Sequence, residues 1–261
     1  MRILVCNDDG ATAPGIALLA RAAGVLSSDV WVVGPSRKWT AASHQLTFDA
    51  DLVLERLAEQ VYACSGAPAD CVVAAMDILF AHGPRPALVL SGINDKRNVA
   101  EDIAYSGTMA IAREASFWGI PAIALSRDPV PADRDDTMHV ARLLELLWNA
   151  RDVWAAPGHW LSLNLPGVLP APIRQARLGR DKIGGGCDVH SASPQRVVYR
   201  NRRGRPATRE PGDENDVLES GAVSLVRHAW TSTAPVAEQA IAAWNATDPP
   251  RGGGSQRNVK L

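Results

Sequence analysis

The opening stretch constrains the fold most, because an apolar run there ends at two adjacent carboxylates. Ile3–Cys6 is unbroken in its apolar character, and Asn7, Asp8, Asp9 and Gly10 follow directly. Such a run is typical of a strand buried on both faces, as in a parallel sheet covered by helices. Ligands of these sheets bind beyond the carboxyl ends of the strands. We therefore expect Asp8 and Asp9 at the functional edge of an α/β sheet.

Two neighbouring carboxylates repel each other unless a positive charge lies between them. A divalent cation is the usual solution, so Asp8 and Asp9 are candidate metal ligands. The alternative is an ordinary capped turn, because Asp and Asn are common turn and helix-cap residues.

The pattern that follows predicts alternating helices and strands. A helix begins at Pro14, with Leu18, Leu19, Ala22 and Leu26 on one apolar face. The next strand, Val30–Val33, completes a β-α-β unit. Further strands are expected at 52–57, 61–64, 87–90, 121–125, 160–165 and 223–226, and further helices at 71–80, 109–118, 135–150 and 235–244.

Bulk properties narrow the class of protein. The chain has 261 residues, is 46% hydrophobic and carries a formal net charge of -1. This size supports a large core, and the charge balance does not favour nucleic acid or an anionic membrane as a partner. The sequence predicts no transmembrane span and no signal peptide. The four cysteines lack zinc or redox spacing, so we expect a reduced, cytoplasmic protein.

Polar segments follow two more of the expected strands. The loop 34–47 carries hydroxyls, cations and His44, and the segment 94–108 ends in Ser106-Gly107-Thr108 before a helix. The free amides and hydroxyls at that helix start can bind an anion such as phosphate, although a plain helix cap uses the same residues. In a parallel sheet, both segments meet Asp8 and Asp9. All the candidate ligands there are oxygen atoms, which favours Mg²⁺, Mn²⁺ or Ca²⁺ over Zn²⁺.

The chain changes character after Pro166. We predict a Rossmann-like core over residues 1–168, a C-terminal extension with strands, a basic arm and a terminal helix over 169–250, and a disordered tail over 251–261. The segment 174–209 holds ten Lys or Arg residues against two Asp. A basic arm can bind nucleic acid, but a solvated extension or a subunit contact is the more ordinary interpretation.

Several ordered motifs resemble the survival-protein E (SurE) family of metal-dependent 5'-nucleotidases. They cover residues 1–126, and weaker similarity follows at 163–166 and 221–224. The motifs are Arg2–Gly10 with Ala13–Ile16, Gly34–Pro35 with Ala42–Thr47, Gly66–Val72, Ser91–Asn94 with Asn98 and Asp102, Tyr105–Thr108, and Gly119–Ser126.

The resemblance implies a Rossmann-like, mostly parallel sheet flanked by helices, with a smaller C-terminal part that helps to form dimers or tetramers. It implies hydrolysis of nucleoside monophosphates, and in some members of short polyphosphate. It also implies a site: Asp8 and Asp9 as catalytic residues, Asp8, Asp9, Thr40 and Asn94 as metal ligands, and Asn98, Ser106, Gly107 and Thr108 as the phosphate site.

This chain departs from the family pattern at four positions. Thr40 replaces a Ser and retains the hydroxyl, while His44 replaces an Asn. Lys96 and Ala100 stand where the family has Gly, in a loop that approaches the phosphate. Side chains there restrict the backbone and crowd the site. Alternatively, Lys96 and Arg97 add phosphate contacts.

The resulting hypothesis is a metal-dependent phosphomonoester hydrolase acting on nucleoside 5'-monophosphates, with 3'-nucleotides or polyphosphate as further substrates. Three alternatives stay open. They are a phosphatase for another small phosphoester, a nucleotide- or phosphate-binding protein without turnover, and nucleic-acid binding through the basic segment.

Overall fold

The computed structural model describes residues 1–131, 134–181, 184–203, 209–230 and 237–247. The chain divides into two compact units, Met1–Trp230 and Thr231–Leu261. In the second unit the described residues form one helix, α8 (Glu238–Thr247). The predicted tail, 251–261, lies outside the described residues.

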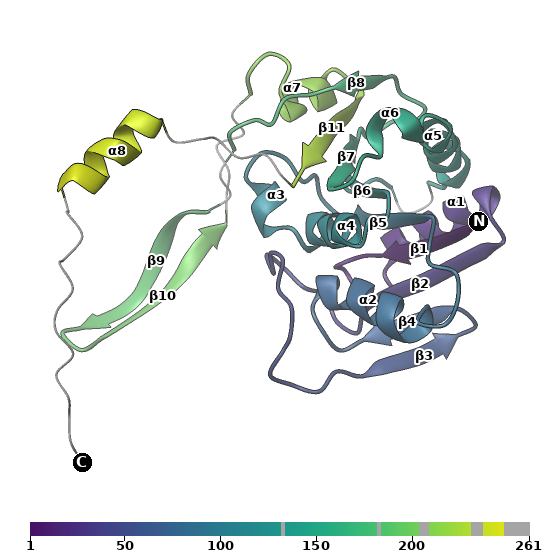
Figure 1. Ribbon diagram of the computed structural model, residues 1–261, viewed down its shortest axis with the longest axis horizontal. Helices are drawn as coiled ribbons and strands as arrows, with labels where there is room; N and C mark the ends of the chain where they lie inside the picture. The colour runs from purple at the N-terminus through teal and green to yellow at the C-terminus, as the bar shows by residue number, and fades with distance from the viewer. Residues whose placement is uncertain (132–133, 182–183, 204–208, 231–236, 248–261) are drawn as a thin grey trace. The chain divides into compact units, whose positions relative to one another are not determined.

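A nine-stranded sheet organises the first unit. Its strand order is β3-β4-β2-β1-β5-β6-β7-β11-β8 (Figure 1). The six strands from β4 to β7 are parallel, whereas β3 and β11 each run antiparallel to a neighbour. The strands are β1 (Arg2–Cys6), β2 (Asp29–Pro35), β3 (Leu54–Ala58), β4 (Val61–Cys64), β5 (Leu88–Asn94), β6 (Ala122–Arg127), β7 (His159–Leu165), β8 (Ile173–Gln175) and β11 (Val223–Ala229).

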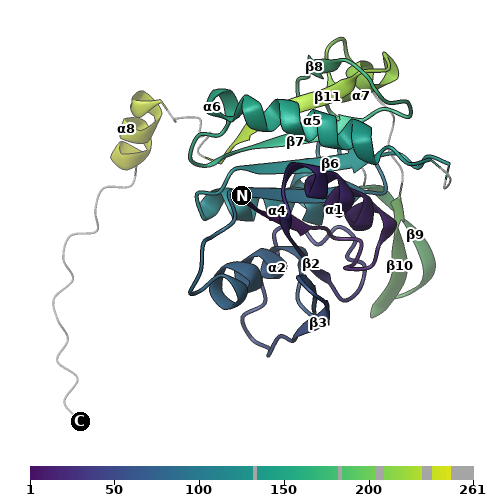
Figure 2. The same ribbon diagram turned by 90° about the vertical axis from the view of Figure 1, so that its right-hand side faces the viewer.

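Helices cover both faces of this sheet, so its central strands are apolar on both sides. In β1, Ile3 and Val5 pack with α1 and α5, while Leu4 and Cys6 pack with α2 and α4. Figure 2 looks onto the face of the sheet that α1 and α5 cover. This arrangement confirms the doubly buried strand and the α/β class. The helices are α1 (Pro14–Leu26), α2 (Pro68–Ala74), α3 (Asp102–Tyr105), α4 (Gly107–Phe117), α5 (Thr137–Asn149), α6 (Arg151–Trp154) and α7 (Glu214–Glu219).

The strand order reverses between β1 and β5. The chain runs from β1 through α1 to β2 on one side, and β5 later pairs with β1 on the other side. Open α/β sheets bind their ligands at such a switch point, beyond the carboxyl ends of the strands. Asp8 and Asp9 follow β1 and Asn94 ends β5, so this crevice holds three of the predicted site residues.

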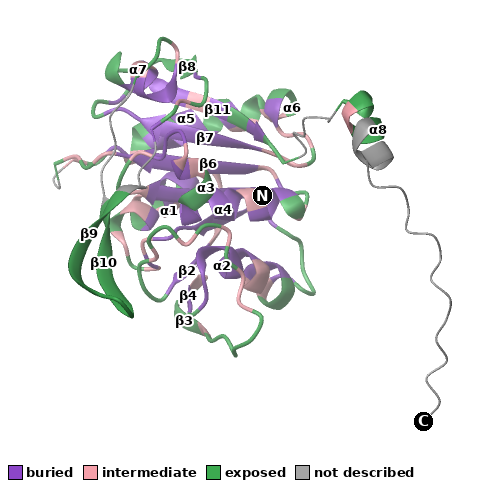
Figure 3. Ribbon diagram, turned by 90° about the vertical axis from the view of Figure 1, so that its left-hand side faces the viewer, coloured by how far each residue is buried: buried purple, intermediate pink, exposed green. Residues whose placement is uncertain are grey.

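The structure differs from the sequence prediction most clearly in two segments. The helix expected over 71–80 begins earlier, at Pro68, and continues as a π-helical turn over Ala75–Leu79. The basic segment forms an antiparallel hairpin, β9 (Gly184–Ser193) with β10 (Arg196–Arg203). Figure 3 shows this hairpin as exposed, in contrast to the buried sheet. Its Gly-rich start and many charges conceal the two-residue alternation that signals a strand.

The sheet also draws on the predicted extension. β11 pairs with β7 along six residues, and β8 pairs with β11. The predicted boundary near residue 168 therefore falls inside the first compact unit, which continues to Trp230. Of the helices in the described residues, none has the length and apolar character needed to cross a bilayer.

Candidate active site

The turn after β1 is fixed by Asn7. Its side-chain amide donates to Gly10 O at 2.8 Å, and Gly10 N donates back to Asn7 Oδ1 at 3.3 Å. Gly10 has φ 121°, a backbone conformation that residues with a Cβ rarely adopt. The closed turn sets Asp8 into the protein interior and Asp9 into the wall of a cavity.

Asp8 is held by the start of α4. Thr108 Oγ1 donates to Asp8 Oδ1 at 2.6 Å, and the Asp8 side chain is almost fully buried. Burial raises the pKa of Asp8 to about 6; hydrogen bonds from Thr108 lower this pKa, and the nearby Asp9 charge raises it. A Cβ on Gly107 would lie 2.8 Å from Asp8 Cβ, so only glycine admits this carboxylate against the helix.

The N-terminus of α4 thus contributes to Asp8 as well as to the predicted phosphate site. Ser106 is the N-cap, with its hydroxyl accepting from Met109 N at 3.2 Å, and it lines the cavity. The Thr108 hydroxyl donates to Asp8, and the phosphate role of Thr108 stays a prediction. Ser91 Oγ donates to Thr108 O at 2.8 Å and ties the helix start to β5.

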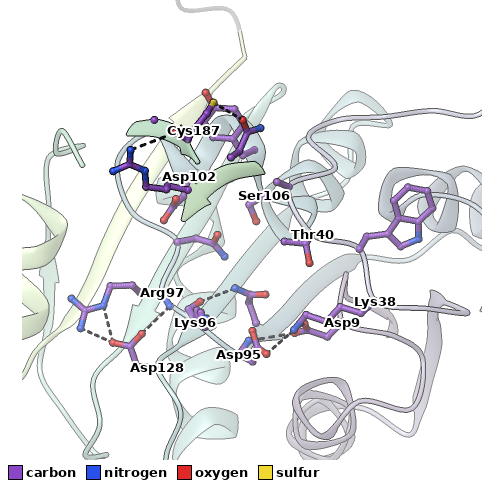
Figure 4. Close-up of a pocket in the computed structure, with 18 residues that line it drawn as sticks. Asp9, Lys38, Thr40, Asp95, Lys96, Arg97, Asp102, Ser106, Asp128 and Cys187 are labelled. Atoms are coloured by element: carbon purple, nitrogen blue, oxygen red, sulfur yellow. Dashed lines mark hydrogen bonds and ion pairs between the residues drawn. The ribbon is translucent and has the colours of Figure 1, made fainter. Parts of the chain in front are cut away.

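Asp9 carries a partner that the sequence did not indicate. Lys38 Nζ lies 2.5 Å from Asp9 Oδ1 and 2.6 Å from Asp95 Oδ2, and Figure 4 shows it between the two carboxylates. Asp95 N donates to Asp9 Oδ2 at 3.3 Å. Burial lowers the pKa of Lys38, but the hydrogen bonds with Asp9 and Asp95 outweigh it, so the pKa is raised overall.

Thr40 and Asn94 lie in the wall of the same cavity as Asp9. Asn94 closes β5, and its Nδ2 donates to Lys96 O at 2.7 Å, which orients the amide. Thr40 precedes Ala41, whose φ of 54° turns the loop sharply. The structure therefore brings three of the four predicted metal ligands to one cavity, with Asp8 buried next to them.

Asn98 is positioned by the ends of two further strands. Its backbone N and O bond to the side chain of Asn164 at 2.8 and 2.9 Å, and its Nδ2 donates to Ser126 Oγ at 2.8 Å. Ser126 lies in β6 and Asn164 in β7. These contacts hold the loop after β5 over the sheet edge, with Asn98 in the cavity wall.

The family departures have visible consequences. Ala100 has φ 53°, the left-handed conformation that a glycine would adopt without strain, and its amide donates to Glu214 Oε2 at 2.7 Å. His44 points to α4, with Nε2 2.8 Å from Glu114 Oε2 and its ring stacked on Phe117. Lys96 is exposed and lines the cavity.

The cavity has a volume of about 990 Å³ and combines both signs of charge. Its acidic lining residues include Asp9, Asp95 and Asp128, and Arg97 pairs with Asp128 at 2.5 Å. Part of the wall comes from the β9–β10 hairpin, which contributes Cys187 and Arg202. A cavity of this size accommodates a nucleotide-sized ligand.

The predicted ligand set suits a hard divalent ion. Among the residues that the structure describes, no group of three or more His, Cys, Asp or Glu side chains gathers to hold a metal. The set instead consists of the Asp8 and Asp9 carboxylates with the Thr40 hydroxyl and the Asn94 amide. These are oxygen donors, which Mg²⁺, Mn²⁺ and Ca²⁺ prefer. The buried Asp8 carboxylate, held by Thr108, also favours a cation beside it.

Four residues that contact the site residues or their loops were not predicted from the sequence. Lys38 and Asp95 stand in polar loops where many charges are merely solvated, so nothing in the sequence singled them out. Asn164 left a weak signal as a polar residue inside the apolar strand 160–165. Glu214 left none, because its contact with Ala100 joins residues 114 positions apart.

Comparisons with known proteins show which family the chain is similar to. The family model described as survival protein SurE matches residues 3–184. A 5'-nucleotidase SurE from Paramagnetospirillum magneticum is 37% identical over 237 residues, which cover 86% of this chain and 88% of that protein. A 5'-nucleotidase SurE from Azorhizobium caulinodans is 48% identical over 136 residues, covering 52% of this chain and 53% of that protein.

A solved structure extends the similarity to the whole fold. The crystal structure of the SurE protein from Aquifex aeolicus has a TM-score of 0.75 and 27% sequence identity, and the match covers 95% of this chain and 99% of that one. The resemblance seen in the motifs and the expected fold class are both confirmed. The chain belongs to the survival protein SurE family.

Proposed function

We propose that this protein is a metal-dependent 5'-nucleotidase, a hydrolase that releases phosphate from nucleoside 5'-monophosphates. One observation carries the proposal: Asp8, Asp9, Thr40, Asn94 and the N-terminus of α4 meet at the switch point of the sheet, beside a nucleotide-sized cavity. The 5'-nucleotidases named among its relatives support the same reaction class.

Asp8, Asp9, Thr40 and Asn94 would hold the divalent ion. When bound, such an ion supplies charge for a phosphoryl oxygen and lowers the pKa of water. Ser106 and Asn98, which line the cavity, would bind the phosphate, and the α4 N-terminus would stabilise negative charge near them. Hydrolysis breaks the bond between phosphorus and the ribose oxygen; water supplies the new oxygen, and its proton passes to the leaving group.

Burial and a hydrogen bond from Thr108 set the ionisation and the orientation of Asp8. With a pKa of about 6, its carboxylate is mostly ionised at neutral pH. Thr108 holds Asp8 Oδ1 by a hydrogen bond, and this contact fixes the orientation of the whole carboxylate, including Oδ2. Asp8 would therefore serve as a ligand. In addition, Asp8 or Asp9 would accept the proton of the attacking water, or would displace the ribose oxygen to form an aspartyl phosphate that water then hydrolyses.

A phosphate-release assay tests the proposal. The full chain is incubated at neutral pH with a panel of 5'- and 3'-nucleoside monophosphates, short polyphosphate and sugar phosphates, with EDTA or with added Mg²⁺ or Mn²⁺. We expect release that depends on the metal and is fastest with 5'-monophosphates. Metal-dependent release from sugar phosphates alone would point to the alternative phosphatase, and release unaffected by EDTA would contradict the metal site.

One observation favours a binding protein without turnover. Both Asp9 oxygens already have partners, Lys38 and Asp95 N, so this carboxylate is satisfied within the chain. That alternative predicts a higher melting temperature with nucleotide present and no phosphate released. The same samples distinguish it from the hydrolase.

We further propose that the chain forms homodimers or homotetramers in the cytoplasm. The β9–β10 hairpin supports assembly, because Val189 and its cross-strand partner Tyr199 expose apolar surface. The cytoplasmic location accords with four free cysteines, three of them buried.

A further inference from the structure

The ammonium group of Lys38 lies against Asp9, one of the proposed metal ligands. It contacts Asp9 Oδ1 at 2.5 Å and Asp95 Oδ2 at 2.6 Å, and Figure 4 shows this bridge among the residues that line the cavity. Asp95 N occupies the second Asp9 oxygen at 3.3 Å. An incoming cation therefore meets a carboxylate whose negative charge is already neutralised.

The two carboxylates that hold Lys38 differ in their exposure to water. The Asp9 side chain is 9% exposed, the Asp95 side chain 56% and the Lys38 side chain 49%. Attraction between charges is stronger where water is excluded, so the contact with Asp9 binds the ammonium more tightly than the contact with Asp95. The flexible Lys stem allows the ammonium to leave Asp9 while it stays on Asp95.

We propose that the Lys38 ammonium competes with the divalent metal for Asp9, and that Asp95 binds this ammonium when the metal displaces it. This inference rests on the proposed function, because it assumes that Asp9 is a metal ligand. In this role Lys38 sets the concentration of metal at which the site is filled. The metal binds only when the Lys38–Asp9 ion pair opens.

The proposal predicts opposite effects for the two partners. Removing the Lys38 charge frees Asp9, so the metal binds more tightly. Removing the Asp95 charge deprives the displaced ammonium of its second carboxylate, so Lys38 stays on Asp9 and the metal binds more weakly. Without Lys38, Asp95 has no ammonium to retain, so its replacement then has little effect.

The test is a calorimetric titration of the metal-free full chain with Mn²⁺ at physiological salt. The proteins are the wild type, Lys38→Met, Lys38→Arg, Asp95→Asn and the Lys38→Met/Asp95→Asn double variant. Lys96→Met is the matched control, since it removes an equal charge from another lysine in the cavity wall. Circular dichroism and melting temperature verify that each variant is folded.

We expect Lys38→Met to tighten Mn²⁺ binding by about fivefold to tenfold, the equivalent of one partly buried ion pair. The Mn²⁺ affinity of Lys38→Arg should stay within about twofold of the wild type, because arginine retains the competing charge. The affinity of Lys96→Met should stay in the same range, because a surface charge is screened by salt. Asp95→Asn should weaken binding about threefold in the wild type and leave the Lys38→Met affinity nearly unchanged, because removing its ion-pair partner abolishes the coupling.

Three results would overturn the proposal. Equal or weaker Mn²⁺ binding by Lys38→Met contradicts the competition while leaving the metal site intact. An equal loss from Asp95→Asn in both backgrounds contradicts the role of Asp95 as the ammonium's second partner. An absence of Mn²⁺ binding in all the proteins overturns the metal site and the competition together, which separates failure of the proposed function from failure of this inference.

Discussion

Thr108 determines how the buried Asp8 carboxylate is held. Its hydroxyl donates to Asp8 Oδ1 at 2.6 Å, and the Thr108 side chain is itself fully buried. A buried carboxylate that loses a donor is harder to ionise, so its pKa rises further. A residue predicted to bind phosphate thus also holds the carboxylate that is proposed to act in catalysis.

Thr108→Val tests this contact because valine has nearly the same shape and lacks the hydroxyl. We expect kcat to fall at least tenfold, and the free energy of unfolding to fall by about 1–2 kcal/mol, the cost of an unsatisfied buried acceptor. Thr108→Ser, which retains the hydroxyl, should keep most of the activity. Full activity in the valine variant would contradict the role assigned to this hydrogen bond.

Ala100 stores backbone strain in the loop after β5. Its φ of 53° costs an L-residue about 1–2 kcal/mol relative to glycine. Ala100→Gly relieves this strain but makes the unfolded chain more flexible, so we expect a net gain of about 0.5–1 kcal/mol in unfolding free energy. Denaturant titration measures the change.

Ala17→Gly provides the control for Ala100→Gly. Ala17 is an exposed residue inside α1, where glycine costs about 1 kcal/mol. The same substitution should therefore stabilise at one position and destabilise at the other. A loss of stability in both variants would show that Ala100 is not strained.

Among the contacts between elements, Glu214 joins α7 to the loop after β5, which contains Ala100. Its Oε2 accepts from Ala100 N at 2.7 Å and from Gly179 N at 3.3 Å, while Oε1 is buried without a hydrogen-bond partner in the described structure. Burial raises the pKa of Glu214 to about 7; the two backbone hydrogen bonds lower this pKa, and nearby Asp213 and Asp102 raise it.

This shift predicts a pH-dependent stability. The folded state binds the proton more tightly than the unfolded state, whose carboxyl has a pKa near 4.5. The contribution of Glu214 is therefore fully present below about pH 4.5 and is lost as the pH rises through 7, by up to about 3 kcal/mol. Urea unfolding of the wild type and Glu214→Gln from pH 4 to 8 measures it. The prediction fails if both proteins show the same pH dependence.

Sequence patterns predicted elements best where burial is continuous. The run Ile3–Cys6 has one interpretation because both faces of β1 are covered, and the structure confirms it. The hairpin of β9 and β10 escaped prediction, since its exposed strands carry little apolar alternation. The π-helical turn after α2 likewise has no signature in residue type.

The site was predictable to the extent that strand ends carry it. Asp9, Asn94 and Thr40 could be placed together because a parallel sheet brings its carboxyl ends to one edge. The bridge from Lys38 to Asp9 and Asp95 could not, because it depends on loop conformations and not on strand direction. The sequence pattern of the strands predicts which residues lie at the carboxyl edge of the sheet. It does not predict which of these residues form ion pairs or hydrogen bonds with one another.

At the scale of the whole molecule, assembly is expected to depend on the exposed hairpin. Val189 and Tyr199 lie opposite each other on β9 and β10, and both are more than half exposed. Replacing both by Lys should lower the molar mass seen by light scattering, because charged residues oppose burial of this surface. The melting temperature at low protein concentration should stay unchanged. An unaltered mass would exclude the hairpin from the interface.

Phosphate release at the switch point of the sheet is proposed to depend on Asp8. The most direct test compares the wild type with Asp8→Asn in phosphate release from a 5'-nucleoside monophosphate, with Mg²⁺ or Mn²⁺ and with EDTA. We expect metal-dependent turnover in the wild type and at least a thousandfold loss in a folded Asp8→Asn variant, an effect of about 4 kcal/mol on the barrier. Activity within a few-fold of the wild type would contradict it.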